Sequence, residues 1–209
     1  MHNDHTITIH PSSHIRKGTS DLIVLKYITQ RVRLTLHQLE QPTMPAHLLI
    51  YNLQERHGRI HRIALYQCQE LLQRKSLHFV GFISRKQKQL DSSITDEIHT
   101  IDQKLVAELI DHPSVLSYSS LELRTGIWCN LVLLSDNEAK RRFQSTQTHA
   151  YAAHQLAPRY YEWIRLHSGS MPNGLFHETM RVQKTRYYTF QPTQHKPSIQ
   201  ELVYTDTDK

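Results

Sequence analysis

Two histidines in the second half of the chain are the side chains best suited to catalysis, His149 and His167. An imidazole moves protons near neutral pH and ligates metals, haem iron included. His149 lies near the end of an expected helix, so it is a candidate general base or iron ligand. The alternative is a helix-end residue that bonds a backbone carbonyl, and the sequence leaves both open.

Aromatic and cationic side chains gather in residues 158–167, among them Tyr160, Tyr161 and Arg165. Such a set suits the rim of a pocket for an anionic or aromatic molecule, because a guanidinium binds carboxylates and rings cover apolar surface. Tyr161, Arg165 and His167 together can polarise a carbonyl or hold a carboxylate. The alternative is that the rings pack this segment onto the core while Arg165 is solvated.

His57 and His61 are four residues apart, a spacing that places both imidazoles on one face of a helix, as a zinc site can use. The zinc-enzyme motif with this spacing carries a glutamate after the first histidine, and Gly58 stands there. No third ligand is evident in the sequence. Solvent-facing histidines are therefore the preferred interpretation, and no metal site is predicted.

Composition narrows the class of protein. The 209 residues carry a formal net charge of +6, and the basic residues are spread along the chain, which disfavours nucleic-acid binding. Cys68 and Cys129 lie outside any Cys-x-x-Cys pattern, so neither a disulfide scaffold nor a cysteine zinc site is indicated. The chain lacks an apolar run of about 18 residues and a signal-peptide core, so a cytoplasmic protein without a membrane span is expected.

Apolar periodicity predicts the elements that position these side chains. Ser20 and Asp21 are expected to cap the first helix, and Ser135 and Asp136 a later one. The expected strands are residues 47–53, 77–84, 115–123, 127–134 and 179–190. The expected helices are residues 20–39, 54–75, 95–110, 136–157 and the first part of 160–174.

From Leu77 onward, the order strand, helix, strand, strand, helix, strand predicts an α+β fold of the ferredoxin-like type. This fold is one antiparallel sheet with helices on one face, here extended by an N-terminal helix and strand. The predicted organisation is a flexible polar arm at 1–19, a single domain at 20–190 with its core at 77–190, and a loose tail at 191–209.

The segment NLVLLSDNEAKRRFQSTQTHAYAAHQLAP, residues 130–158, resembles the second half of the dimeric α/β-barrel superfamily, which contains antibiotic-biosynthesis monooxygenase-like and stress-responsive proteins. In that group a strand runs into an acidic-capped helix that ends in a histidine, where His149 stands here. The resemblance spans residues 77–190. It implies a homodimer whose two sheets pair into a barrel, and a pocket between sheet and helices. The residues before the core and the insert at 160–174 depart from the family.

The haem-degrading members of that group also use an asparagine and a tryptophan in the pocket. Here Trp128 and Asn130 lie on the strand before the helix, away from the positions of that pattern, and they join the predicted ligand-binding residues. The identity of any cofactor is left open by the sequence.

These features predict a small-ligand-binding or oxygenase-like protein with a pocket for a small apolar or aromatic molecule. The catalytic candidates are His149 and His167. The ligand-binding candidates are Trp128, Asn130, Tyr160, Tyr161 and Arg165. The alternative is a non-catalytic binding or assembly protein that acts through a protein surface. A cavity lined by His149, Tyr161 and Arg165 favours the first function, and a closed core favours the second.

Overall fold

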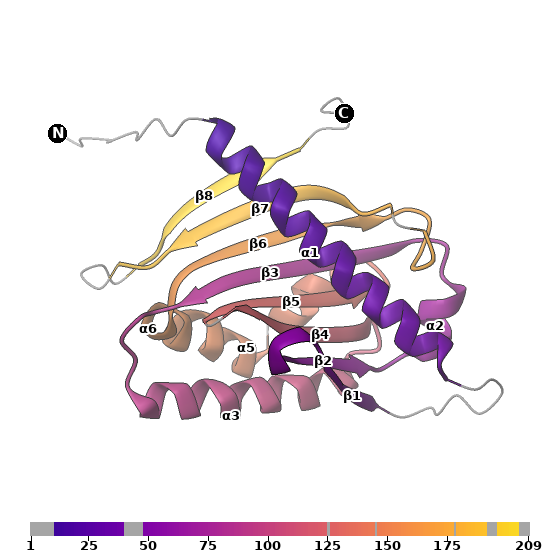
Figure 1. Ribbon diagram of the computed structural model, residues 1–209, viewed down its shortest axis with the longest axis horizontal. Helices are drawn as coiled ribbons and strands as arrows, with labels where there is room; N and C mark the ends of the chain where they lie inside the picture. The colour runs from indigo at the N-terminus through magenta and orange to yellow at the C-terminus, as the bar shows by residue number, and fades with distance from the viewer. Residues whose placement is uncertain are drawn as a thin grey trace.

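The computed structural model describes residues 11–39, 48–124, 126–144, 146–177, 179–191 and 196–204. Within them the strands form one antiparallel sheet in the order β1-β2-β4-β5-β3-β6-β7-β8 (Figure 1). The strands are β1 Leu49–Gln54, β2 Ile60–Leu65, β3 Leu77–Lys86, β4 Val115–Arg124, β5 Ile127–Leu134, β6 Tyr161–Met171, β7 Arg181–Thr189 and β8 Ser198–Val203. The α-helices are α1 Pro11–His37, α2 Cys68–Gln73, α3 Ser92–Glu108, α4 Glu138–Gln144, α5 Gln147–Tyr151 and α6 Ala157–Tyr160. Short turns of other helix types are η1 Arg56–Gly58, η2 Leu109–Asp111 and the π-helical η3 Ala152–Leu156.

The central strands β4-β5-β3-β6 have the ferredoxin-like arrangement. Strand β3 leads through α3 to β4, a hairpin leads to β5, and α4 to α6 lead to β6, which returns to pair with β3. The predicted fold class, α+β with a ferredoxin-like antiparallel sheet, is therefore confirmed. Strands β1 and β2 extend the sheet on one side of this core, and β7 and β8 extend it on the other.

Helices cover both faces of the sheet (Figure 1). In the expected apolar stripe of α1, Leu25, Val32 and Leu36 are buried against one face, and Leu22 and Leu39 pack there partly buried. Val106 of α3 packs on the opposite face in a second core cluster. Helix α1 approaches β3 so closely that a Cβ added at Gly81 would lie 2.6 Å from a methyl carbon of Leu25. Helix α1 would therefore lie between the sheets if two copies paired this face of their sheets, as the resemblance implies.

Two segments expected to be helical are strands, which is a correction to the predicted fold. Residues 54–75 contain β2 and only a short α2, and residues 160–174 contain β6. Strand β2 is flanked by β1 and β4, so ladder hydrogen bonds outweigh the apolar spacing that suggested a helix. In β6 the alternation was hidden because Arg165 and His167 occupy inward positions. Strand β6, and not β7, is the fourth strand of the ferredoxin-like core.

The predicted terminal segments also differ from the structure. Helix α1 begins at Pro11, so residues 11–19 of the expected arm are helical, and residues 1–10 lie outside the described residues. The expected loose tail, 191–209, contains β8, which pairs with β7. All six residues of β8 are exposed, so the strand lacks the alternation by which a sequence reveals a half-buried strand.

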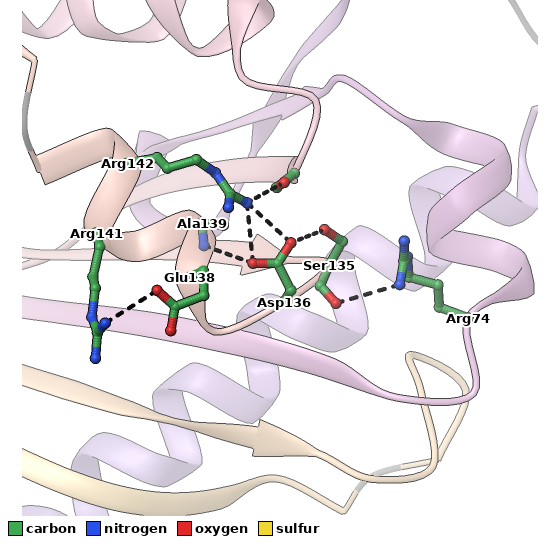
Figure 2. A network of polar contacts seen from close by, with 8 residues as sticks. Arg74, Ser135, Asp136, Glu138, Ala139, Arg141 and Arg142 are labelled. Carbon is green, nitrogen blue, oxygen red and sulfur yellow. Dashed lines mark hydrogen bonds and ion pairs between the residues drawn. The ribbon is translucent and has the colours of Figure 1, made fainter.

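The expected cap of the helix after β5 is confirmed (Figure 2). An oxygen of the Asp136 carboxylate accepts a hydrogen bond from the backbone N–H of Ala139 at 2.7 Å. Arg142, one turn further on, donates to the same carboxylate at 3.1 Å, and the Ser135 hydroxyl donates to it at 3.0 Å. The first N–H groups of a helix have no carbonyl acceptor within the helix, and the Asp136 side chain supplies one of them with a hydrogen-bond partner. Among the described residues, no helix is long and apolar enough to cross a membrane.

Candidate functional site

An open groove lies at one end of the sheet, where the β1–β2 and β4–β5 hairpins meet. Strands β2 and β4 pair with His61 opposite Leu121, which brings the start of β2 beside the end of β4. The groove has a volume of about 510 Å³. Its lining residues are His57, Gly58, Arg59, Ile60, Glu122, Arg124 and Trp128. A volume of this size is typical of sites for small molecules.

The groove combines an indole ring with an excess of positive charge. Arg59 and Arg124 face a single carboxylate, Glu122, and neither guanidinium forms an ion pair within the part of the chain that the structure describes. One oxygen of Glu122 accepts a hydrogen bond from the backbone N–H of Gly126 at 2.8 Å, which holds the β4–β5 turn. The remaining donors can therefore bind an external anion, and the partly buried Trp128 ring offers a surface for stacking.

The predicted site residues are divided between the two faces of the sheet. In β5, Trp128 and Asn130 lie on the same face of the sheet as Val132, the face that α3 covers, whereas Cys129 lies on the opposite face. Arg165 and His167 project from the opposite face toward α1, as their bonds to Asp21 establish. A pocket formed jointly by His149, Tyr161 and Arg165 is therefore not present, because β6 separates Arg165 from the other two. Of the predicted ligand-binding residues, Trp128 alone lines the groove.

Arg165 and His167 belong to a buried polar cluster under α1. Arg165 donates to both oxygens of Asp21, with distances of 2.6 and 2.7 Å. The His167 Nε2–H donates to Asp21 at 3.0 Å, and its Nδ1 shares a hydrogen bond of 2.9 Å with the Thr185 hydroxyl. The Arg165 guanidinium also lies 4.2 Å from the centre of the Trp163 ring. Asp21 was expected to cap a helix, but it lies within α1 and faces the sheet.

The carboxylate of this cluster is kept in its charged form. Burial on its own would raise the pKa of Asp21, but the hydrogen bonds from His167 and Arg165 and their charges lower it below its ordinary value. Asp21, His167 and Thr185 are each at most 3% exposed, so a ligand has no access to them. This cluster joins α1 to β6 and β7, and its geometry is that of a buried structural ion pair.

Tyr160 and Tyr161 pack on the α3-covered face. Their rings meet edge to face, with centroids 4.8 Å apart, and Tyr161 also contacts Phe82 in the same manner at 5.5 Å. Burial, together with the neighbouring Tyr160 and Asp102, raises the pKa of Tyr161, so its hydroxyl stays protonated. Of the two interpretations of this segment, packing of the rings onto the core describes these tyrosines.

His149 lies in α5, partly buried. Its backbone N–H donates to the Thr146 hydroxyl at 3.2 Å, the cap of that helix. Burial, and then the nearby His154, lower the pKa of the His149 imidazole, so the neutral form is favoured at neutral pH. Its catalytic role stays a prediction.

The expected helical pair His57 and His61 does not exist. His57 is in η1 with a positive φ of 63°, whereas His61 is buried in β2 and its Nδ1 lies 3.3 Å from the Glu55 carboxylate. Within the described ranges, no group of three or more His, Cys, Asp or Glu side chains could hold a metal ion. His57, Arg59, Glu122 and Arg124 were missed as site residues. The turn residue Gly58 was the available signal, because a hairpin there places them beside the β4–β5 turn.

Comparison with known proteins finds similarity in solved structures alone. No family model and no curated protein matches the chain. A protein from Shewanella oneidensis is 10% identical over 47% of this chain and 93% of its own, with a TM-score of 0.40. SnoaB, a cofactor-independent oxygenase from Streptomyces nogalater, is 13% identical over 47% of this chain and 92% of its own, with a TM-score of 0.34. A chain from Lactobacillus acidophilus NCFM, described as a candidate monooxygenase, is 10% identical over 58% of this chain and 55% of its own, with a TM-score of 0.39.

Two of these three structures are named as oxygenases, and the likenesses cover 47% to 58% of this chain. At such identities and TM-scores, no statement about activity, cofactor or oligomeric state follows from them. The interpretation of the groove and of the buried cluster therefore depends on the geometry of this chain's own residues.

Proposed function

We propose that this protein binds a small anionic aromatic molecule in the groove between the β1–β2 and β4–β5 hairpins. The observation that carries the proposal is the meeting of Trp128 with Arg59 and Arg124 in one groove of about 510 Å³. An aromatic carboxylate fits this combination, because its ring can lie against the indole while its carboxylate binds a guanidinium.

The chemistry of the groove favours binding over oxygenation. Cofactor-free chemistry on a small molecule benefits from a site that excludes water. This groove is open, since His57, Ile60 and Arg124 on its rim are exposed. The oxygenase-like activity expected from the sequence resemblance is thus the less supported proposal, and a binding role is the one to test first.

The presence of only two tryptophans makes the binding test specific. In Trp163→Phe, the remaining fluorescence comes from Trp128, and titration with benzoate, cinnamate or phthalate is expected to change it saturably. In Trp128→Phe, the remaining Trp163 lies against Arg165 at the other face and is expected to stay unchanged. If none of the three acids changes the Trp128 signal, or if Trp163 responds instead, the proposal fails.

The two arginines of the groove should make it prefer a negatively charged ligand over an uncharged one. Arg59→Ala and Arg124→Ala are each expected to weaken binding of the responding acid about tenfold, since a hydrogen bond to a charged group contributes about 1.5–3 kcal/mol. Binding of the uncharged amide of the same acid should change little in either variant. Arg141→Ala is the matched control, because that arginine is on α4, with a side chain 79% exposed, and does not line the groove. Equal losses for acid and amide would contradict recognition of the anion.

The second candidate function, assembly through a protein surface, is favoured by a different observation: all six residues of strand β8, at the edge of the sheet, are exposed.

A further inference from the structure

Strand β8 is an edge strand of the sheet and carries exposed apolar side chains. It pairs with β7 on one side, and the sheet order places no strand beyond it among the described residues (Figure 1). Ile199 is 57% exposed, Leu202 38% and Val203 62%. Glu201 is its one charged residue. An exposed edge with apolar side chains and free backbone groups is a template for pairing with another strand.

The direction of the backbone groups follows from the pairing with β7. The Tyr204 N–H donates to the Gln183 carbonyl of β7, directly beyond the last pair of the ladder, Lys184 and Val203. Because the direction of the N–H and C=O groups alternates along a strand, every second residue from Tyr204 back bonds to β7. The N–H and C=O groups of Ile199, Glu201 and Val203 therefore point away from the sheet.

We propose that a second copy of this chain pairs with that edge, β8 against β8, antiparallel and centred on Glu201. This register places Ile199 of one copy opposite Val203 of the other, twice, on the same face of the joined sheet. Each of the outward N–H and C=O groups of residues 199, 201 and 203 gains a partner. Any antiparallel strand would satisfy the backbone groups, but the two Ile199–Val203 contacts arise from the spacing of β8 itself, which is why the partner is another copy.

The charge at the centre of this register is compensated within each chain. Glu201 would stand opposite Glu201 of the other copy, and like charges in that position repel. Lys184 and Arg186 of β7 hold this carboxylate, at 2.9 and 2.5 Å. Hydrogen bonds from both side chains lower the pKa of Glu201, so the ion pairs persist at neutral pH. Each copy therefore brings a local excess of positive charge to the carboxylate pair.

Edge pairing is also compatible with the core contacts of the helices that cover the sheet. Helix α1 packs on one face and α3 with α4 on the other, and none of the residues in these core clusters comes from β8. A contact between two six-residue strands is smaller than the standard interface of about 1,600 Å². The dimer is thus expected to be weak and to depend on protein concentration.

The test combines mass in solution with an edge variant. The measured mass should rise from 24.6 kDa toward twice this value as concentration increases. Ile199→Lys with Val203→Lys should keep one-chain mass at every concentration, and the chain should stay folded because both side chains are exposed. Ile50→Lys, at an exposed position of the opposite edge strand β1, is the matched control and should dimerise normally. A one-chain mass throughout for the unmodified protein overturns the proposal, as does a dimer that survives the double lysine change.

Amide exchange provides a second readout that needs no variant. Exchange of the Ile199, Glu201 and Val203 amides should slow at least tenfold between dilute and concentrated protein. The amides of Gln200, Leu202 and Tyr204 should be equally protected at both concentrations, because they bond to β7. A dimer in which the first set of amides exchanges as fast as in the monomer would contradict pairing at this edge.

Discussion

Replacement of Asp21 by asparagine is expected to lower the free energy of unfolding by about 3–5 kcal/mol, the usual loss when a buried ion pair keeps only one partner. The Arg165 guanidinium, whose side chain is 16% exposed, would lose its counter-charge and its bidentate partner, and it would share the single remaining amide oxygen with His167. Urea unfolding, followed by fluorescence, measures the change. A loss under about 1 kcal/mol would mean that α1 is held by its apolar stripe alone.

Three further variants make this result specific to the ion pair. Ile23→Asn lies on the same helix but at a side chain 65% exposed, and it should change stability by less than about 0.5 kcal/mol. Arg165→Met on its own should destabilise strongly, whereas Arg165→Met combined with Asp21→Asn should cost less than the sum, because the two residues interact directly.

The same cluster predicts a dependence of stability on pH. The folded-state pKa of Asp21 lies below its ordinary value of 3.8, so the folded protein binds this proton less readily than the unfolded chain does. The stability contributed by Asp21 is therefore complete above about pH 3.8 and is lost as pH falls through the lower folded-state pKa. The difference in stability between the unmodified protein and Asp21→Asn should accordingly shrink in that acidic window.

Gly169→Ala is expected to be the second most damaging change, at about 3 kcal/mol, near the upper end of the cost of overpacking. A Cβ at this position would lie 1.9 Å from the backbone oxygen of Arg181 and 2.9 Å from a ring carbon of Phe79. The neighbouring atom is backbone, so it cannot rotate away. The register of β6 and β7 shifts between Ser168 and Gly169, and this bulge permits the close approach.

Ser170→Ala is the matched control for that prediction, because it changes the next residue of β6 without adding volume. Its hydroxyl accepts one long bond, 3.5 Å, from Gln183, so little stability depends on it. Thermal unfolding of both variants should show a clear loss for Gly169→Ala only. Similar melting temperatures for the two would mean that β7 can shift to accommodate a methyl group.

The parts of the fold that the sequence predicts correctly are those with local signals. The stripe of α1 and the Asp136 cap each depend on residues within a few positions of one another. Strand β6 was missed because its inward residue Arg165 is polar, and polar inward residues look like a solvated face. Its partner Asp21 is 144 positions away, so no local pattern reveals that the charge is neutralised.

The sequence predicted only one residue of the candidate site, because the others reach it through long-range strand pairing. Trp128 was identified as a ligand-binding candidate, whereas Arg59 and Arg124 join it through the pairing of β2 with β4. The segment around Arg59 was expected to be helical, and a helix would not have placed it beside the β4–β5 turn. Arg165 was assigned to the ligand, but a carboxylate of the chain itself already binds it.

The most direct measurement of binding in the groove is a nuclear magnetic resonance titration that follows the two indole N–H signals. With the acid that binds best among benzoate, cinnamate and phthalate, the Trp128 signal should move saturably while the Trp163 signal stays in place. The side-chain signals of Arg59 and Arg124 should move with the same dissociation constant as Trp128. Movement of Trp163 instead, or no movement of either indole signal, would contradict a ligand site in the groove.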